Sequence, residues 1–314
     1  NSVAELGDWS DFQLGKAGRI AEPMVLEAGS THYQPIGWEE ANAMIAGELK
    51  ALNHPDEAVF YTSGRTSNEA AFMYQLMVRA FGTNNLPDCS NMCHESSSHG
   101  LGNTIGISKG TVTLEDIHRS DLLIIIGQNP GTNHPRMLSS LEKCKENGGK
   151  IITINPLKEA GLVNFVNPQR LGKMLSGGTP LTDLYLPVAV NGDVALLKAI
   201  MLRLWHQDRE QEGRILDWDF ISEKTADYEN FVEDLRKHDF TDLATASGVP
   251  RAQILEAVAM IRKAKSVIVC WAMGVTQHEN GVANVQEIVN LLLMKGAIGK
   301  PGSGVCPVRG HSNV

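Results

Sequence analysis

Residues 91–97 of the 314-residue chain read NMCHESS and place a thiol, an imidazole and a carboxylate side by side at Cys93, His94 and Glu95. A cysteine in such a setting is a metal ligand, a nucleophile or a small apolar side chain of the core. Ionisable neighbours argue against the core, because burying an unpaired charge is costly. A lone thiolate also suits a soft metal whose other ligands come from a cofactor. The serines at 96–98 predict a helix start, where backbone amides and the imidazole would lower the pKa of the thiol.

Other cofactor motifs are weak in this sequence. Cys89 and Cys93 are four positions apart with no second pair of cysteines, which argues against a structural zinc site. The run GLGNTIG from Gly100 to Gly106 has one residue too many before its last glycine to match the dinucleotide fingerprint, and no predicted strand precedes it. The sequence has no Walker A motif and no serine nucleophile elbow. A nicotinamide-dependent dehydrogenase therefore rests on the glycine run alone.

The composition is that of an ordinary globular protein, with 42% hydrophobic and 20% charged residues. A formal net charge of -8 argues against a nucleic-acid partner, since backbone binding relies on clustered Lys and Arg. No apolar run reaches the ~18 residues that a membrane span needs, so no membrane partner is expected. The five cysteines form no paired framework, which fits a reducing, cytoplasmic setting. The sequence lacks an initiator methionine and ends within a loop at Val314, so we expect a fragment of a longer protein.

The elements that must position Cys93 alternate between strands and helices. The clearest buried strand is DLLIIIG at 121–127, and KIITI at 150–154 follows after one helix, which predicts adjacent parallel strands. Further strands are predicted at 58–61, 184–190 and 266–271, and helices at 38–52, after a Thr66–Glu69 capping box, at 134–147, from 193, three times within 216–247, from 250 and at 279–294. The fold class is therefore α/β, with an open and mostly parallel sheet that helices cover on both faces.

Ligands of such sheets bind at the carboxyl ends of the strands, where amides of the following helices can hold phosphate. Five loops at these ends are rich in Asn, Gln, Ser or Thr: 63–68, 127–134, 155–158, 191–193 and 273–277. Any one of them alone is most simply a tight turn or a helix cap. Five at one edge of a sheet favour a ligand site.

These stretches, in their order, resemble the formate-dehydrogenase type of molybdopterin oxidoreductase, in the DMSO reductase superfamily. In that family a cysteine or selenocysteine followed by histidine ligates molybdenum or tungsten, as Cys93 and His94 would here. The matching segments are YTSGRTSNE at 61–69, IGQNP at 126–130, GDVALL at 192–197, MGVTQ at 273–277 and GKPGSG at 299–304, and the match runs from about residue 19 to the end. The segments YTSGRTSNEAAF and NMCHE resemble those of a YdeP-like branch of the family, which is linked to acid resistance.

The resemblance implies two domains and a catalytic site. Residues 1–88 would be part of a second α/β domain, and residues 89–314 a Rossmann-like α/β domain that binds the pterin cofactor. Cys93 would be the catalytic metal ligand, His94 would manage a proton or orient the metal's sulfur, and Arg309 would hold a carboxylate substrate bidentately. The implied reaction is two-electron oxidation of a small-molecule acid, with an unknown electron acceptor. The alternative is a module that keeps the fold and binds a nucleotide or a partner without turnover.

The resemblance also implies a bis-molybdopterin guanine dinucleotide with molybdenum or tungsten, and leaves open an iron–sulfur cluster outside this sequence. The residues that would bind the cofactor are Ser63, Arg65, Asn68, Gly127, Gln128, Asn129, His134, Asn155, Gly192, Asp193, Met273, Gly274, Thr276 and Gln277. Where relatives often have Asp-Pro-Arg after the second strand, this chain has Asn155-Pro156-Leu157, so the acidic partner of the guanosine sugar is missing. The fragment alone is expected to be empty and inactive, because regions outside it complete the site and exclude water.

Overall fold

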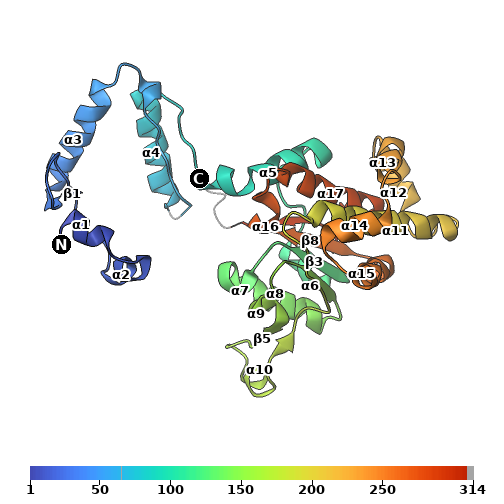
Figure 1. The fold of residues 1–314 in the computed structure, drawn as a ribbon. Coiled ribbons are helices and arrows are strands. Elements are labelled where there is room, and N and C mark those ends of the chain that lie inside the picture. Colours follow the sequence, from blue (N-terminus) through green and yellow to red (C-terminus); the bar gives the residue numbers. More distant parts are fainter. Residues whose placement is uncertain (65, 310–314) are drawn as a thin grey trace. The chain divides into compact units, whose positions relative to one another are not determined.

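The computed structural model describes residues 1–64 and 66–309. The chain divides between Asp88 and Cys89 into two compact units, whose elements are drawn in Figure 1. The assignment of these units to domains of a longer protein stays a prediction.

The first unit, Asn1–Asp88, is built from helices and one short antiparallel hairpin. Its elements are α1 (Val3–Gly7), α2 (Asp11–Lys16), β1 (Met24–Val25), β2 (Gln34–Pro35), α3 (Trp38–Ala51), η1 (Pro55–Glu57) and α4 (Asn68–Phe81). Helix α3 confirms the helix predicted at 38–52. The core of this unit is small, and Phe60 packs edge-on against Tyr74 and Phe81, with ring centroids 6.1 and 5.7 Å away.

Two local predictions for this unit are wrong. The segment 58–61 is extended but forms no strand, because its backbone finds only isolated partners: the N–H of Phe60 donates to the carbonyl of Asn85 at 2.9 Å, and Thr62 forms a single bridge with Asp88. Helix α4 is capped by Ser67, whose hydroxyl accepts the N–H of Ala70 at 3.3 Å. The predicted cap at Thr66 lies one residue too early.

The second unit carries a five-stranded sheet, and all of its strands are parallel. The strands are β3 (Leu122–Ile126), β4 (Lys150–Ile154), β7 (Leu184–Leu186), β8 (Val267–Trp271) and β9 (Gly304–Pro307), in the spatial order β7-β4-β3-β8-β9. The chain starts at the centre with β3, winds out to β4 and β7, and then crosses back to β8 and β9. The predicted α/β class and parallel pairing are confirmed, while the edge strand β9 was not predicted.

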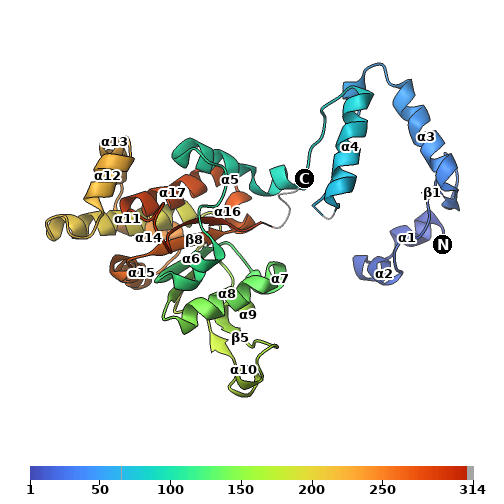
Figure 2. The ribbon, with the colours of Figure 1, turned by 180° about the vertical axis from the view of Figure 1, so that it is seen from behind.

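Helices cover both faces of this sheet, as Figure 1 shows and Figure 2 repeats from behind. One face is covered by α5 (Cys89–Ile105), α11 (Asp193–Glu210), α14 (Phe240–Ser247), α15 (Arg251–Lys263) and α17 (Gly281–Met294), with α12 (Trp218–Lys224) and α13 (Tyr228–Leu235) packed outside. The other face is covered by α6 (Leu114–Arg119), α8 (Pro135–Glu146) and α9 (Ala160–Val163). Along β3, Leu122 and Ile124 point into the first core and Leu123 and Ile125 into the second, as the period of two in a strand requires.

The glycine run at 100–106, which matches the dinucleotide fingerprint poorly, lies in helix α5 as far as Ile105. A Cβ on Gly100 would lie 2.7 Å from the Cβ of Val285 on α17, so this glycine lets the two helices pack closely. It therefore forms no phosphate-binding loop, and the nicotinamide interpretation loses its only motif.

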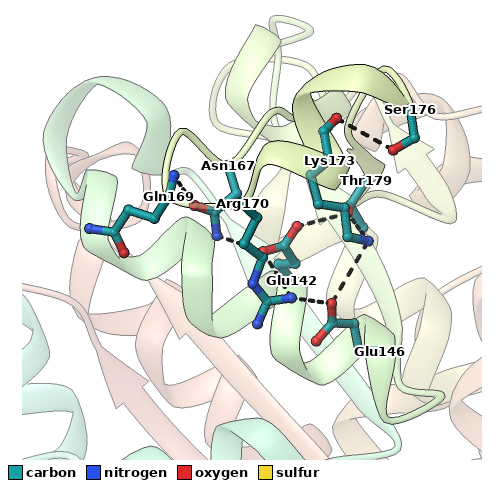
Figure 3. Close-up of polar contacts among 8 residues, drawn as sticks. All are labelled: Glu142, Glu146, Asn167, Gln169, Arg170, Lys173, Ser176 and Thr179. Atoms are coloured by element: carbon teal, nitrogen blue, oxygen red, sulfur yellow. Dashed lines mark hydrogen bonds and ion pairs between the residues drawn. The ribbon is translucent and has the colours of Figure 1, made fainter.

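An excursion between β4 and β7 contains β5 (Asn164–Phe165), α10 (Leu171–Leu175) and β6 (Thr179–Pro180). Figure 3 shows the polar contacts that tie it to α8. Glu142 is 1% exposed, and its carboxylate accepts hydrogen bonds from the Asn167 amide and the Thr179 hydroxyl, both at 2.8 Å. Arg170 pairs with Glu146 at 2.5 Å. Burial opposes the charge on Glu142, yet these two hydrogen bonds hold its pKa below the ordinary value.

Candidate functional site

A cavity of about 470 Å³ lies where four parallel strands end. It is lined by Cys93, His94, Gly127, Gln128, Asn129, Asn133, His134, Asn155, Glu159, Ala272, Met273, Gly274, Val308 and Arg309. Apart from the first two, these residues come from the segments after β3, β4, β8 and β9. The volume is in the range of small-molecule and cofactor sites. The chain reverses its winding direction between β3 and β8, and ligands of open parallel sheets bind at such a switch point.

Two glycines bring the loops after β3 and β8 into direct contact. The N–H of Gly274 donates to the carbonyl of Gly127 at 3.0 Å, and a Cβ on Gly274 would lie 2.6 Å from the Cα of Gly127. Gly127 also has φ +57°, which favours glycine. Gly274 belongs to the single helical turn α16 (Met273–Thr276). A residue with a side chain at either position would force the two loop backbones apart.

Gln128 presents an unsatisfied acceptor at the cavity. The residue is 2% exposed, and its Oε1 has no hydrogen-bond partner among the described residues. Its Nε2 contacts Met137 Sδ at 3.1 Å and His134 Nδ1 at 3.4 Å. Burial lowers the pKa of His134, which favours the neutral form of this imidazole. A buried acceptor without a partner is costly, which favours a ligand that donates to it.

Cys93 reaches the cavity through a break in helix α5. His94 has φ -135° and ψ 18°, which interrupts the helix. The freed carbonyl of Cys93 accepts from the Thr276 hydroxyl at 2.6 Å, and the carbonyl of Met92 accepts from Gln277 Nε2 at 2.5 Å. Thr276 and Gln277 therefore hold the backbone of the cysteine segment.

The expected low pKa of the Cys93 thiol is wrong for the chain by itself. Burial raises the pKa of Cys93, the neighbouring Cys89 adds to the rise, and the positive charge of Arg309 opposes it. Helix α5 is interrupted at His94, so a further helical segment begins directly after this residue, close to the start predicted at 96–98, yet burial still raises the pKa of the thiol.

His94 is 1% exposed and belongs to a buried hydrogen-bond chain. Its Nδ1 lies 3.1 Å from Ser97 Oγ, and the indole N–H of Trp271, at the end of β8, donates to the same oxygen at 2.9 Å.

Of the remaining predicted residues, Gly192 and Asp193 lie in the second unit and do not line the cavity. Gly192 and Asp193 start helix α11, and Asp193 is 5% exposed, with burial raising its pKa to about 6. Ser63 and Asn68 belong to the first unit. Arg65 lies outside the described residues.

Four lining residues were missed, namely Asn133, Glu159, Ala272 and Val308. Glu159 Oε2 accepts from Asn129 Nδ2 at 2.8 Å, so Asn129 ties the loops after β3 and β4 together. Ala272 and Val308 directly follow strand residues, and their small or apolar side chains carry no chemical signal in the sequence.

A second hollow, of about 560 Å³, lies at the amino-terminal edge of the sheet. Both of its aspartates have partners: Asp183 pairs with Lys150 at 3.1 Å, and the carboxylate of Asp121 accepts from the N–H groups of Lys265 and Ser266. It carries no indication of a ligand.

No group of three or more His, Cys, Asp or Glu side chains within the described part of the chain is arranged to hold a metal ion. A metal at Cys93 would take its other ligands from a cofactor. Among the described helices, none combines the length and apolar character needed to cross a membrane.

The fold and this cavity define an α/β protein with a small-molecule-sized cavity at the ligand edge of its parallel sheet, and comparison with known proteins identifies the family. The family model described as molybdopterin oxidoreductase matches residues 19–313, and the chain belongs to that family. This confirms the resemblance drawn from the sequence and implies a molybdopterin cofactor with molybdenum or tungsten.

Three curated relatives show which members of the family this chain is similar to. An uncharacterized oxidoreductase of Mycobacterium tuberculosis is 49% identical over 314 residues, covering 100% of this chain and 40% of the relative. Protein YdeP of Escherichia coli is 48% identical over 319 residues, covering 100% of this chain and 42% of YdeP. The alpha subunit of F420-dependent formate dehydrogenase 2 from Methanococcus maripaludis is 32% identical over 297 residues, covering 94% of this chain and 40% of the subunit. The chain thus spans about two fifths of the length of these relatives.

Acetylene hydratase from Pelobacter acetylenicus is similar in structure, with a TM-score of 0.71 and 16% identity over 92% of this chain and 37% of that enzyme. At this identity the likeness supports the fold alone.

Proposed function

We propose that this chain is the central, cofactor-binding and catalytic portion of a formate-dehydrogenase-like molybdopterin oxidoreductase that oxidises a small acid by two electrons. The single observation that carries the proposal is the cavity that Cys93, His94 and Arg309 line together, at the carboxyl ends of the parallel strands. Arg309 lies more than two hundred positions after Cys93, so their presence in the lining of one cavity is a result of tertiary folding.

The residues present fit the proposed cofactor. Cys93 offers one soft thiolate, which suits molybdenum or tungsten beside sulfur ligands of a pterin. The buried Oε1 of Gln128 has no donor within the described part of the chain, and the amide and ring groups of a pterin carry donors. When bound, the metal centre would supply the two-electron redox chemistry. Gly127 and Gly274 place no side chain on this part of the cavity lining, which suits the close approach of a flat ligand.

Arg309 and His94 would act on the substrate side. A planar guanidinium binds a carboxylate through two parallel hydrogen bonds, which orients a small acid in a way that lysine cannot reproduce. His94 adjoins the proposed metal ligand and lines the same cavity. The guanine dinucleotide form of the cofactor, the electron acceptor, a cytoplasmic location and a link to acid resistance belong to the same proposal. So does the expectation that this chain alone is inactive, since other regions of the longer relatives would complete the site.

Metal and pterin analysis of the intact protein, from a host that makes the cofactor, tests the proposal. We expect near-stoichiometric molybdenum or tungsten, and we expect Cys93→Ala to lose the metal. Cys144→Ala is the matched control, because Cys144 is fully buried in the second core, away from the cavity. Wild-type protein with neither element would overturn the proposal. Metal content and turnover unchanged in Cys93→Ala would favour the alternative, a binding module that keeps the fold.

A further inference from the structure

We propose that Cys270 and Cys306, which lie opposite each other on neighbouring strands, form a site of reversible oxidation where a peroxide joins the two thiols in a disulfide. Both thiols are free in the structure. The inference goes beyond the proposed function and does not depend on the metal cofactor.

The register of the sheet places the two cysteines side by side. Cys270 on β8 pairs with Cys306 on β9, and the two strands run parallel. Neighbouring strands lie about 4.8 Å apart, which falls within the range of about 4.4–6.8 Å between Cα atoms that a disulfide allows. The two backbones therefore need no rearrangement to bring these residues within bonding range.

Both side chains point to the same face of the sheet. Cys270 belongs to the second core, and Cys306 packs against that core. Their neighbours along the strands, Trp271 and Val305, belong to the first core, as the alternation of side chains in a strand requires. The two thiols therefore lie on one side of the backbone, where their sulfur atoms can meet.

Strand β9 is at the edge of the sheet, and this position allows the small movement that the bond needs. A disulfide brings the two Cβ atoms to about 3.8 Å, which is closer than the spacing of the strands. On the outer side of β9, the N–H of Thr111 donates to the carbonyl of Val305 at 3.0 Å, and Thr111 Oγ1 accepts the N–H of Val305 at 3.1 Å. These contacts hold the residue before Cys306, so Cys306 itself can tilt toward β8.

The two thiols differ in access and in acidity. Cys270 is fully buried, whereas Cys306 is partly exposed. A hydrogen bond from the Cys270 thiol lowers the pKa of Cys306, and the same contact together with burial raises the pKa of Cys270. Because the thiolate is the nucleophile and the oxidant must reach it, Cys306 reacts first and Cys270 second.

The reaction balances with hydrogen peroxide as the oxidant. The Cys306 thiolate attacks one oxygen, the O–O bond breaks, and the other oxygen leaves as hydroxide, which takes up the proton lost by the thiol to give water. Cys306 is then a sulfenic acid. The Cys270 sulfur attacks the Cys306 sulfur, and the departing hydroxide takes the Cys270 proton as a second water. The two thiols lose two electrons in all, and the peroxide gains them.

The pair lies close to the cavity. Ala272 and Val308 line the cavity, and each follows one of the two cysteines by two residues. The N–H of Val308 also donates to the carbonyl of Trp271 at 2.8 Å. The disulfide would therefore tie together the two strands that carry this part of the lining.

Peptide mapping of the intact protein tests the inference. The protein is treated with hydrogen peroxide, the remaining thiols are blocked by alkylation, and the product is digested with trypsin without reduction. We expect peptides 266–295 and 296–309 to be linked, with a mass lower by two hydrogen atoms than the sum of the free peptides. Dithiothreitol added before the alkylation should remove the link, because Cys306 is open to thiol exchange.

Single substitutions separate the roles of the two thiols. In Cys270→Ala we expect Cys306 to stop at the sulfenic acid, which dimedone labels, because the second thiol is missing. In Cys306→Ala we expect neither a link nor a dimedone label on Cys270, because that thiol is out of reach. Cys144→Ala is the matched control: Cys144 lies in the same core, but its thiol donates to the carbonyl of Ser120 at 3.5 Å, and the link should form as in the wild type.

Peptides 266–295 and 296–309 that stay unlinked in peroxide-treated wild type would overturn the inference. So would a link from Cys270 to Cys144, or a dimedone label on Cys270 in Cys306→Ala. The first two outcomes are read on the wild type and remain decisive if a variant fails to fold. Absence of molybdenum and tungsten from the intact protein would remove the proposed function and leave this result standing.

Discussion

Replacing Gly274 by alanine should destabilise the second unit at the edge where the cavity forms. The added Cβ would lie 2.6 Å from the Cα of Gly127, 2.7 Å from its carbonyl oxygen and 2.9 Å from its carbonyl carbon. All three atoms belong to backbone, which cannot rotate away as a side chain would. The loops after β3 and β8 must therefore separate to admit one methyl group.

The size of the effect can be assembled from its parts. Forcing an extra methyl into a packed contact costs about 1–3 kcal/mol. Separation of the loops weakens the hydrogen bond from Gly274 N–H to the Gly127 carbonyl, which is worth about 1 kcal/mol. Alanine also lowers the conformational entropy of the unfolded chain, which stabilises the folded state by about 0.4–1 kcal/mol. The net expectation is a loss of about 2 kcal/mol in the free energy of unfolding.

Urea unfolding followed by tryptophan fluorescence measures this loss, since Trp271 lies at the end of β8 beside the substituted turn. Gly172→Ala is the matched control: Gly172 also lies in a short helix, and nothing is within 4 Å of a Cβ built on it. There the same change should be neutral or stabilise by about 0.5–1 kcal/mol. If Gly274→Ala unfolds at the wild-type midpoint, the two loops are not in the tight contact on which the cavity depends.

Two further substitutions test contacts away from the cavity. Hydrogen bonds from Gly302 and Thr113 lower the pKa of Asp116 to about 2 from 3.8, so its charge stabilises the fold above pH ~4 and this contribution is lost as the pH falls toward ~2. Asp116→Asn should therefore cost about 2 kcal/mol at pH 7, and urea titrations at decreasing pH should show the difference from wild type shrinking; a constant difference would contradict the assignment. Glu142→Gln should cost about 1–3 kcal/mol, because one of the donors on Asn167 and Thr179 would face an amide N–H₂. Limited proteolysis of residues 164–180 should become faster, and unchanged cleavage would show that this network does not hold the excursion.

The central strands were predictable because their signal is local. Runs such as LLIII at 122–126 are apolar on both faces, and only a strand buried between two helical layers needs that pattern. The edge strand β9 was missed because GVCP at 304–307 contains glycine and proline, which are typical of turns, and its pairing with β8 is a tertiary contact. The segment 58–61 shows the converse, because a strand-like sequence forms no strand where no neighbouring strand pairs with it.

Cavity-lining residues were predictable from the sequence where they directly follow a parallel strand. The carboxyl ends of parallel strands meet at one edge, so Gly127, Asn155 and Gly274 were bound to lie near one another once the strands were known. Side-chain directions were not predictable from this rule. Thr276 and Gln277 follow β8 as expected, yet they turn toward the backbone of α5 and not into the cavity lining.

The order of the strands explains why a cysteine that precedes the whole sheet in the chain can line its ligand edge. Helix α5 comes before β3, packs on α17 through Gly100, and is joined to the turn after β8 by Thr276. It therefore delivers Cys93 to the point between β3 and β8 where the chain changes its winding direction. Arg309 reaches the same place from β9, the last strand added. The thiol and the guanidinium thus reach the cavity from opposite ends of the second unit's sequence, and both positions depend on the order of the strands.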